Sequence, residues 1–109
     1  MSSAARRAKK TGRKNRELLR LDGVIRLAAL GPKAKAAIPA LIRALDDPTE
    51  LVRGQAARAL GRIGPGAKDA VPALLKVYQD KDGPGDVRRA AGAALRQIDP
   101  EAAKKAGVR

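Results

Sequence analysis

Apolar residues recur at intervals of three and four positions along most of the chain, which is the spacing of a helix with one buried face. Residues 33–45 show this pattern clearly, and residues 66–79 repeat it. In the first of these segments the apolar positions are Ala34, Ala37, Ile38, Leu41, Ile42 and Leu45. No long stretch alternates with the period of two that marks a half-buried strand. The pattern therefore predicts an all-α fold.

The helical pattern is itself repeated along the sequence. Leu30-Gly31-Pro32 returns 33 residues later as Ile63-Gly64-Pro65, and Val52-Arg53 returns 35 residues later as Val87-Arg88. The second spacing is larger because the loop at residues 81–85 is longer. Short connections make neighbouring helices pack antiparallel, so the sequence predicts an α-solenoid of two to three stacked helical hairpins. The expected helices, of two alternating types, span residues 15–30, 33–45, 48–63, 66–79, 84–98 and 100–106.

Helix ends are marked by residues with known end preferences. Asp47 precedes a proline and stands three residues before Glu50, an arrangement typical of a helix start, and Asp99-Pro100 repeats its first half. Gly31 and Gly64 can adopt the left-handed backbone that ends a helix. Two internal prolines, Pro39 and Pro72, are expected to bend their helices because each removes one backbone hydrogen bond.

Three segments of the chain resemble the bacterial HEAT repeat, most closely the short repeats of the phycobilisome-lyase-like type. They are residues 46–53 (DDPTELVR), 56–64 (AARALGRIG) and 70–75 (AVPALL), and the resemblance extends over about residues 17–106. The first helix departs from the repeat, since Gly23 and Arg26 occupy the positions that Ala56 and Ala59 hold later. The HEAT resemblance implies a solenoid that serves as an interaction surface.

The resemblance also implies a structural ladder of ion pairs. In HEAT proteins the arginine at the position of Arg53 and Arg88 commonly pairs with an aspartate of the preceding turn, and Asp47 and Asp82 fit that role here. An alternative is that the arginine row contacts a ligand. Arg20 holds the same position but has no aspartate before it, so it is expected to be the freest of the three.

A second set of arginines lies off the apolar stripes of the second helix type, which lines the concave surface of a HEAT array by resemblance. Guanidinium groups on such a surface attract phosphate or carboxylate groups. A solvated helix face explains the same pattern, and the sequence leaves both interpretations open. The members of this candidate binding surface are Arg58, Arg62, Arg89 and Arg96.

The charge of the chain is strongly positive and uneven. Lysine and arginine number 24 against 11 acidic residues, a formal net charge of +13, and eight of the basic residues lie within residues 1–20. Residues 1–14 contain no apolar residue larger than alanine apart from Met1, so we expect a disordered basic arm followed by a HEAT-repeat domain at 15–109. The candidate phosphate-contacting residues are Arg6, Arg7, Lys9, Lys10, Arg13, Lys14 and Arg16.

Composition excludes several kinds of chemistry. The chain has no cysteine and no histidine, which excludes a thiolate nucleophile, a histidine base and a zinc finger, and its one aromatic residue is Tyr78. We expect no catalytic activity, no cofactor and no metal. No stretch approaches the roughly 20 apolar residues of a membrane span, and a cytoplasmic protein is expected.

The leading hypothesis is a scaffold that binds another protein of unknown identity. The competing hypothesis is nonspecific nucleic-acid binding through the basic arm and the arginine-lined concave face. An organellar targeting role for the arm is a third and weaker alternative, because the arm lacks apolar residues for an amphipathic helix. Both terminal helix pairs look incomplete, so residues 100–109 are expected to expose an apolar edge.

Overall fold

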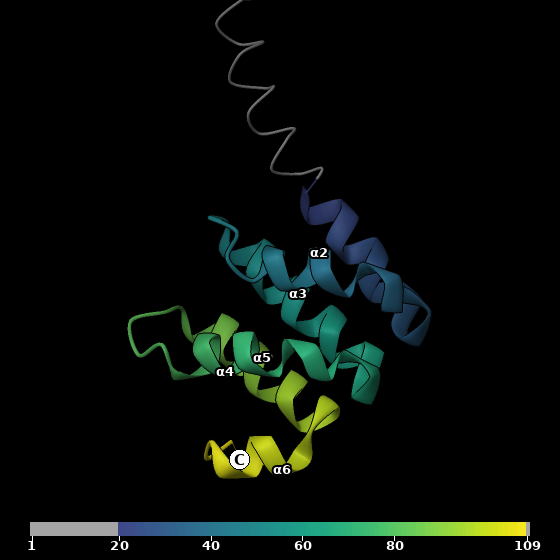
Figure 1. Ribbon diagram of the computed structural model, residues 1–109. Helices are drawn as coiled ribbons and strands as arrows, with labels where there is room; N and C mark the ends of the chain where they lie inside the picture. Colours follow the sequence, from purple (N-terminus) through teal and green to yellow (C-terminus); the bar gives the residue numbers. More distant parts are fainter. Residues whose placement is uncertain (1–19, 109) are drawn as a thin grey trace, which may run out of the picture.

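The computed structural model describes residues 20–108, and within this range every regular element is helical (Figure 1). The all-α prediction is confirmed. A helical segment at residues 20–30 comes first, and the elements that follow it are η1 (Gly31–Ala37), α2 (Ile38–Ala44), α3 (Glu50–Ile63), η2 (Gly64–Ala70), α4 (Val71–Gln79), α5 (Gly85–Ile98) and α6 (Pro100–Lys105), where η marks a 3₁₀ helix.

The helices stack as consecutive pairs along one direction, with α2 and α3 above α4 and α5 in Figure 1 and α6 at the far end. The long helix α3 packs along its repeat equivalent α5, and α4 packs on α5 from the other layer. Each helix pair therefore buries its apolar stripes against the next pair, as a solenoid requires.

The helices that contain the internal prolines are divided rather than bent. In each copy a 3₁₀ segment runs up to Ala37 or Ala70, and an α-helix then begins one residue before the proline. Pro39 and Pro72 thus lie in the first turn of α2 and α4, where a backbone N–H has no partner within the helix. The proline starts a new helix instead of interrupting an old one.

The predicted helix ends are confirmed at three positions and wrong at one. Gly31 and Gly64 have φ values of 56° and 78°, and Asp99 caps α6 by accepting a hydrogen bond from the N–H of Ala102 at 3.2 Å. Asp47 does not cap a helix, because α3 begins only at Glu50. Its carboxylate instead accepts a hydrogen bond from the N–H of Thr49 and closes a tight turn.

The core is made of equivalent leucines from successive helices, and its largest fully buried side chains are Leu41, Leu60, Leu74, Leu95, Ile98 and Val52. At the C-terminal end Ala103 is buried and Val108 packs against the core. The prediction of an exposed apolar edge after residue 100 is therefore wrong for residues 100–108. Among the described residues, the large apolar side chains that are exposed are Ile25, Leu30 and Leu51.

Candidate interaction grooves

Two members of the arginine ladder, Arg53 and Arg88, bind backbone carbonyls rather than aspartate side chains. Arg53 donates through Nη1 to the backbone carbonyl of Asp47 at 2.7 Å, and Arg88 donates through Nε to the carbonyl of Tyr78 at 3.2 Å. Tyr78 lies in the last turn of α4, where carbonyls have no partner within the helix and carry partial negative charge, so the guanidinium of Arg88 satisfies its carbonyl well. The expected Arg88–Asp82 ion pair is wrong, because Asp82 is exposed in a turn closed by its own N–H on Asp80.

Arg20 is also paired, contrary to the expectation that it is the freest of the three. Its Nε lies 2.9 Å from Oδ2 of Asp47, a residue of the next hairpin. Burial of Asp47 acts to raise the pKa of its carboxyl group, but hydrogen bonds from the N–H of Thr49 and from Arg20 outweigh it and hold that pKa below its ordinary value. The aspartate predicted for Arg53 thus holds the helix of residues 20–30 on the turn before α3.

The segment 20–30 and α2 enclose a groove of about 660 Å³, which we call the first groove. Its floor is apolar, with Val24, Leu27, Leu41 and Val52 among the residues that line it. Its charged lining residues are Arg20, Arg26, Arg43 and one acid, Asp47. The first groove is therefore an apolar surface with a net positive rim.

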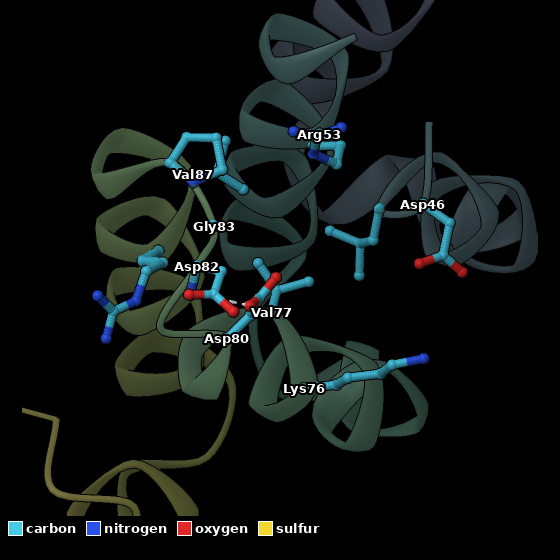
Figure 2. Close-up of a pocket in the computed structure, with 11 residues that line it drawn as sticks. Asp46, Arg53, Lys76, Val77, Asp80, Asp82, Gly83 and Val87 are labelled. Atoms are coloured by element: carbon cyan, nitrogen blue, oxygen red, sulfur yellow. Dashed lines mark hydrogen bonds between the residues drawn. The ribbon is translucent and has the colours of Figure 1, made fainter. Parts of the chain in front are cut away.

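A second groove, of about 440 Å³, lies at the equivalent place one repeat later (Figure 2). Arg53 and Lys76 correspond in the repeat to Arg20 and Arg43 of the first groove. The longer loop before α5 lines this groove with acids, and in Figure 2 Lys76 extends away from Asp80 and Asp82. The charges of the second groove balance: its acids are Asp46, Asp80 and Asp82, and its basic residues are Arg53, Lys76 and Arg88.

The repeated helices agree with a comparison to known protein families. The model for HEAT repeats matches residues 15–96. The chain belongs to the HEAT-repeat family. No curated protein and no solved structure matches it. HEAT repeats in general mediate protein–protein interaction, so a surface of this solenoid is the place to seek function.

The four arginines predicted to line one surface of the HEAT solenoid lie in separate surroundings. Arg58 lines a shallow depression between α3 and α5, and Arg62 points toward the carbonyl of Ala28 at 3.5 Å. Arg89 forms an ion pair with Asp86 and shares a depression near Tyr78 with Arg96. The structure therefore brings Arg89 and Arg96 together but does not bring all four into one lining. The arm residues Arg6, Arg7, Lys9, Lys10, Arg13, Lys14 and Arg16 lie outside the described residues.

Sequence reasoning missed Arg43 and Lys76, which rim the two grooves. A signal for them exists, since both are basic and stand 33 residues apart on the polar side of equivalent helices.

Two kinds of feature are absent from residues 20–108. In this range no three acidic residues come together in a way that would hold a metal ion. The same residues include no helix with the length and hydropathy of a membrane span.

Proposed function

We propose that this HEAT-repeat chain is a non-catalytic cytoplasmic scaffold that binds another protein. The observation that carries the proposal is the first groove, in which an apolar floor is surrounded by arginines on a rigid helical support. Apolar surface with a few polar groups around it is the common composition of protein-binding sites.

The test is capture of partners by the immobilised full chain. Extracts are treated with nuclease or left untreated, and the bound proteins are compared after washing at roughly physiological salt, where weak phosphate contacts are screened. The proposal expects at least one protein to remain stoichiometrically bound after nuclease treatment. Loss of every bound protein on nuclease treatment contradicts it.

The second candidate function is nonspecific nucleic-acid binding, favoured by the net charge of +13 and its concentration near residue 1. Neutralised phosphates release counterions, so the logarithm of the affinity falls with the logarithm of salt by roughly 0.9 per contact on duplex DNA. Salt titration of DNA binding separates the two functions. The full chain is compared with a variant in which the seven basic arm residues named above are glutamine.

Nucleic-acid function predicts binding that persists near physiological salt and a much shallower slope for the variant. The scaffold function predicts DNA binding at low salt at most. It also predicts partner affinity that the arm variant retains.

A further inference from the structure

The first helix departs from the HEAT pattern at the residues that border the first groove. Ala56 and Ala59 are fully buried in α3, whereas the equivalent positions of the first helix hold Gly23 and Arg26. A Cβ placed on Gly23 would meet no atom within 4 Å, and the side chain of Arg26 is 80% exposed. Two positions that serve the core in the second repeat are therefore open in the first.

One wall of the second groove is built from residues whose equivalents in the first repeat are not apolar in the sequence. Leu45 and Asp46, at the end of α2, close that side of the second groove. The positions 33 residues earlier are Gly12 and Arg13. Residues 1–14 contain no apolar side chain larger than alanine apart from Met1, so the composition of this segment does not supply a substitute for the leucine.

The charges of the rim select the kind of molecule. Among residues 20–108, Arg26 pairs with Asp22 of its own helix, and because both side chains are mostly exposed, that pair is weak and can be exchanged. Arg43 is exposed and has no ion-pair partner among the described residues. Two guanidinium groups are thus available on the rim. A second copy of a chain with net charge +13 is a poor complement to them, and an acidic segment is a good one.

We propose that the first groove binds an acidic amphipathic helix of a partner protein. Apolar side chains on one face of that helix lie on Leu27 and over Gly23, and carboxylates beside them bind Arg26 and Arg43. The groove, at about 660 Å³, falls within the usual range of binding pockets, about 300–1,000 Å³. Helix-in-groove binding uses this combination of spaced apolar anchors and flanking charges. The inference rests on the scaffold function proposed above and names the surface and the partner chemistry.

The test uses synthetic peptides of about 16 residues, long enough to form a helix on binding. One peptide carries leucines at helical spacing with glutamates beside them. A second replaces the glutamates with lysines, and a third replaces the leucines with serines. Fluorescence anisotropy measures their affinity for the full chain at roughly physiological salt, where screening limits nonspecific charge attraction.

Gly23→Leu is the blocking variant, because it fills the groove at a helical position with open space and favourable helix propensity. Gly54→Leu is its matched control, since Gly54 is also helical with open space but lies on α3 outside the first groove. Arg43→Glu tests the rim, and Lys76→Glu is its repeat-equivalent control. Circular dichroism melting verifies that all four variants fold.

We expect the acidic leucine peptide to bind at least tenfold more tightly than either altered peptide. We expect Gly23→Leu and Arg43→Glu to lower the affinity for the acidic leucine peptide at least tenfold. The two control variants should keep that affinity within twofold of the wild type. Equal binding of the serine peptide, or equal loss in a control variant, overturns the proposal. Dimers of the wild-type chain that Gly23→Leu dissociates also overturn it, because the occupant is then a second copy.

The captured cellular partner separates this inference from the function on which it rests. If a partner binds Gly23→Leu as well as it binds the wild type, the scaffold function is supported but the first groove is not its binding site. Absence of any nuclease-resistant partner removes the scaffold function itself. Loss of that partner from Gly23→Leu but not from Gly54→Leu supports both.

Discussion

The ion pair between Arg20 and Asp47 joins the helix of residues 20–30 to the next hairpin, and its removal is the sharpest test of the fold at this end. Asp47→Asn keeps an oxygen that can accept the hydrogen bond from the N–H of Thr49, but it removes the charge that faces Arg20. The Asp47 side chain is 10% exposed and that of Arg20 is 44% exposed. The pair is thus neither fully buried nor free in water.

The stability that Asp47→Asn is expected to lose follows from this partial burial. Exposed ion pairs contribute about 0.2–1 kcal/mol, while hydrogen bonds to charged groups contribute about 1.5–3 kcal/mol where solvent screening is weak. Because solvent reaches Arg20, we expect Asp47→Asn to lower the free energy of unfolding by about 1 kcal/mol. Asp47→Ala removes the turn hydrogen bond as well, and we expect a loss of about 2 kcal/mol.

The direction of the Asp47 pKa shift determines how the stability of the chain depends on pH. The pKa of Asp47 is lower in the folded chain than its ordinary value of 3.8, so its contribution to stability is present above that value. The contribution is lost as pH falls through the lower folded pKa, because protonation then favours the unfolded state. Urea titrations at neutral pH and at several pH values below 4 measure the difference in the free energy of unfolding between the wild type and Asp47→Asn. We expect this difference to be constant at higher pH and to become smaller in acid.

Asp46→Asn is the control, because Asp46 is exposed and makes no side-chain hydrogen bond among the described residues. If Asp47→Asn and Asp46→Asn lower the free energy of unfolding equally, the role assigned to the Arg20–Asp47 pair is wrong. It is also wrong if the effect of Asp47→Asn stays the same in strong acid.

Three further predictions concern the packing between repeats. Leu60→Ala and Leu95→Ala are each expected to destabilise the chain by about 2–4 kcal/mol, since both leucines are fully buried; unchanged urea midpoints for both contradict the helix register. Gly61→Val is expected to cost about 1–3 kcal/mol, because a Cβ there meets Cα of a residue in α5 at 3.0 Å, and a thermal melt like that of the parent speaks against this contact. Arg88→Met is expected to cost about 1 kcal/mol and Asp82→Asn nothing measurable, since the guanidinium binds a carbonyl; equal losses in chemical denaturation restore the ion-pair interpretation.

The helices could be predicted from the sequence because the signals for them are local. The spacing of apolar residues needs only the chain itself, and so do the glycines at positions 31 and 64 and the cap at Asp99. Even the division at Pro39 and Pro72 has a local reason, the tolerance of proline in a first helical turn. These features were predicted or needed only refinement, because no distant residue decides them.

The partners of the arginines were predicted less well because distant residues decide them. Arg53 binds the carbonyl of Asp47, while Arg20 binds its carboxylate. Nothing in the spacing of the repeat reveals that Arg20 reaches across 27 residues to take that carboxylate. The first groove was missed for the same reason, since its walls come from segments whose approach is a property of the folded chain.

The two ends of the described part of the solenoid differ in their surfaces. At one end α6 lies across the last repeat, and the hydroxyl of Tyr78 donates to the carbonyl of Gly107 at 3.4 Å. At the other end Ile25 and Leu30 are exposed and Gly23 leaves open space. A solenoid needs capping residues at its ends to avoid association through apolar faces. The arginines beside this open face are the reason why the occupant proposed above is an acidic amphipathic helix and not another basic chain.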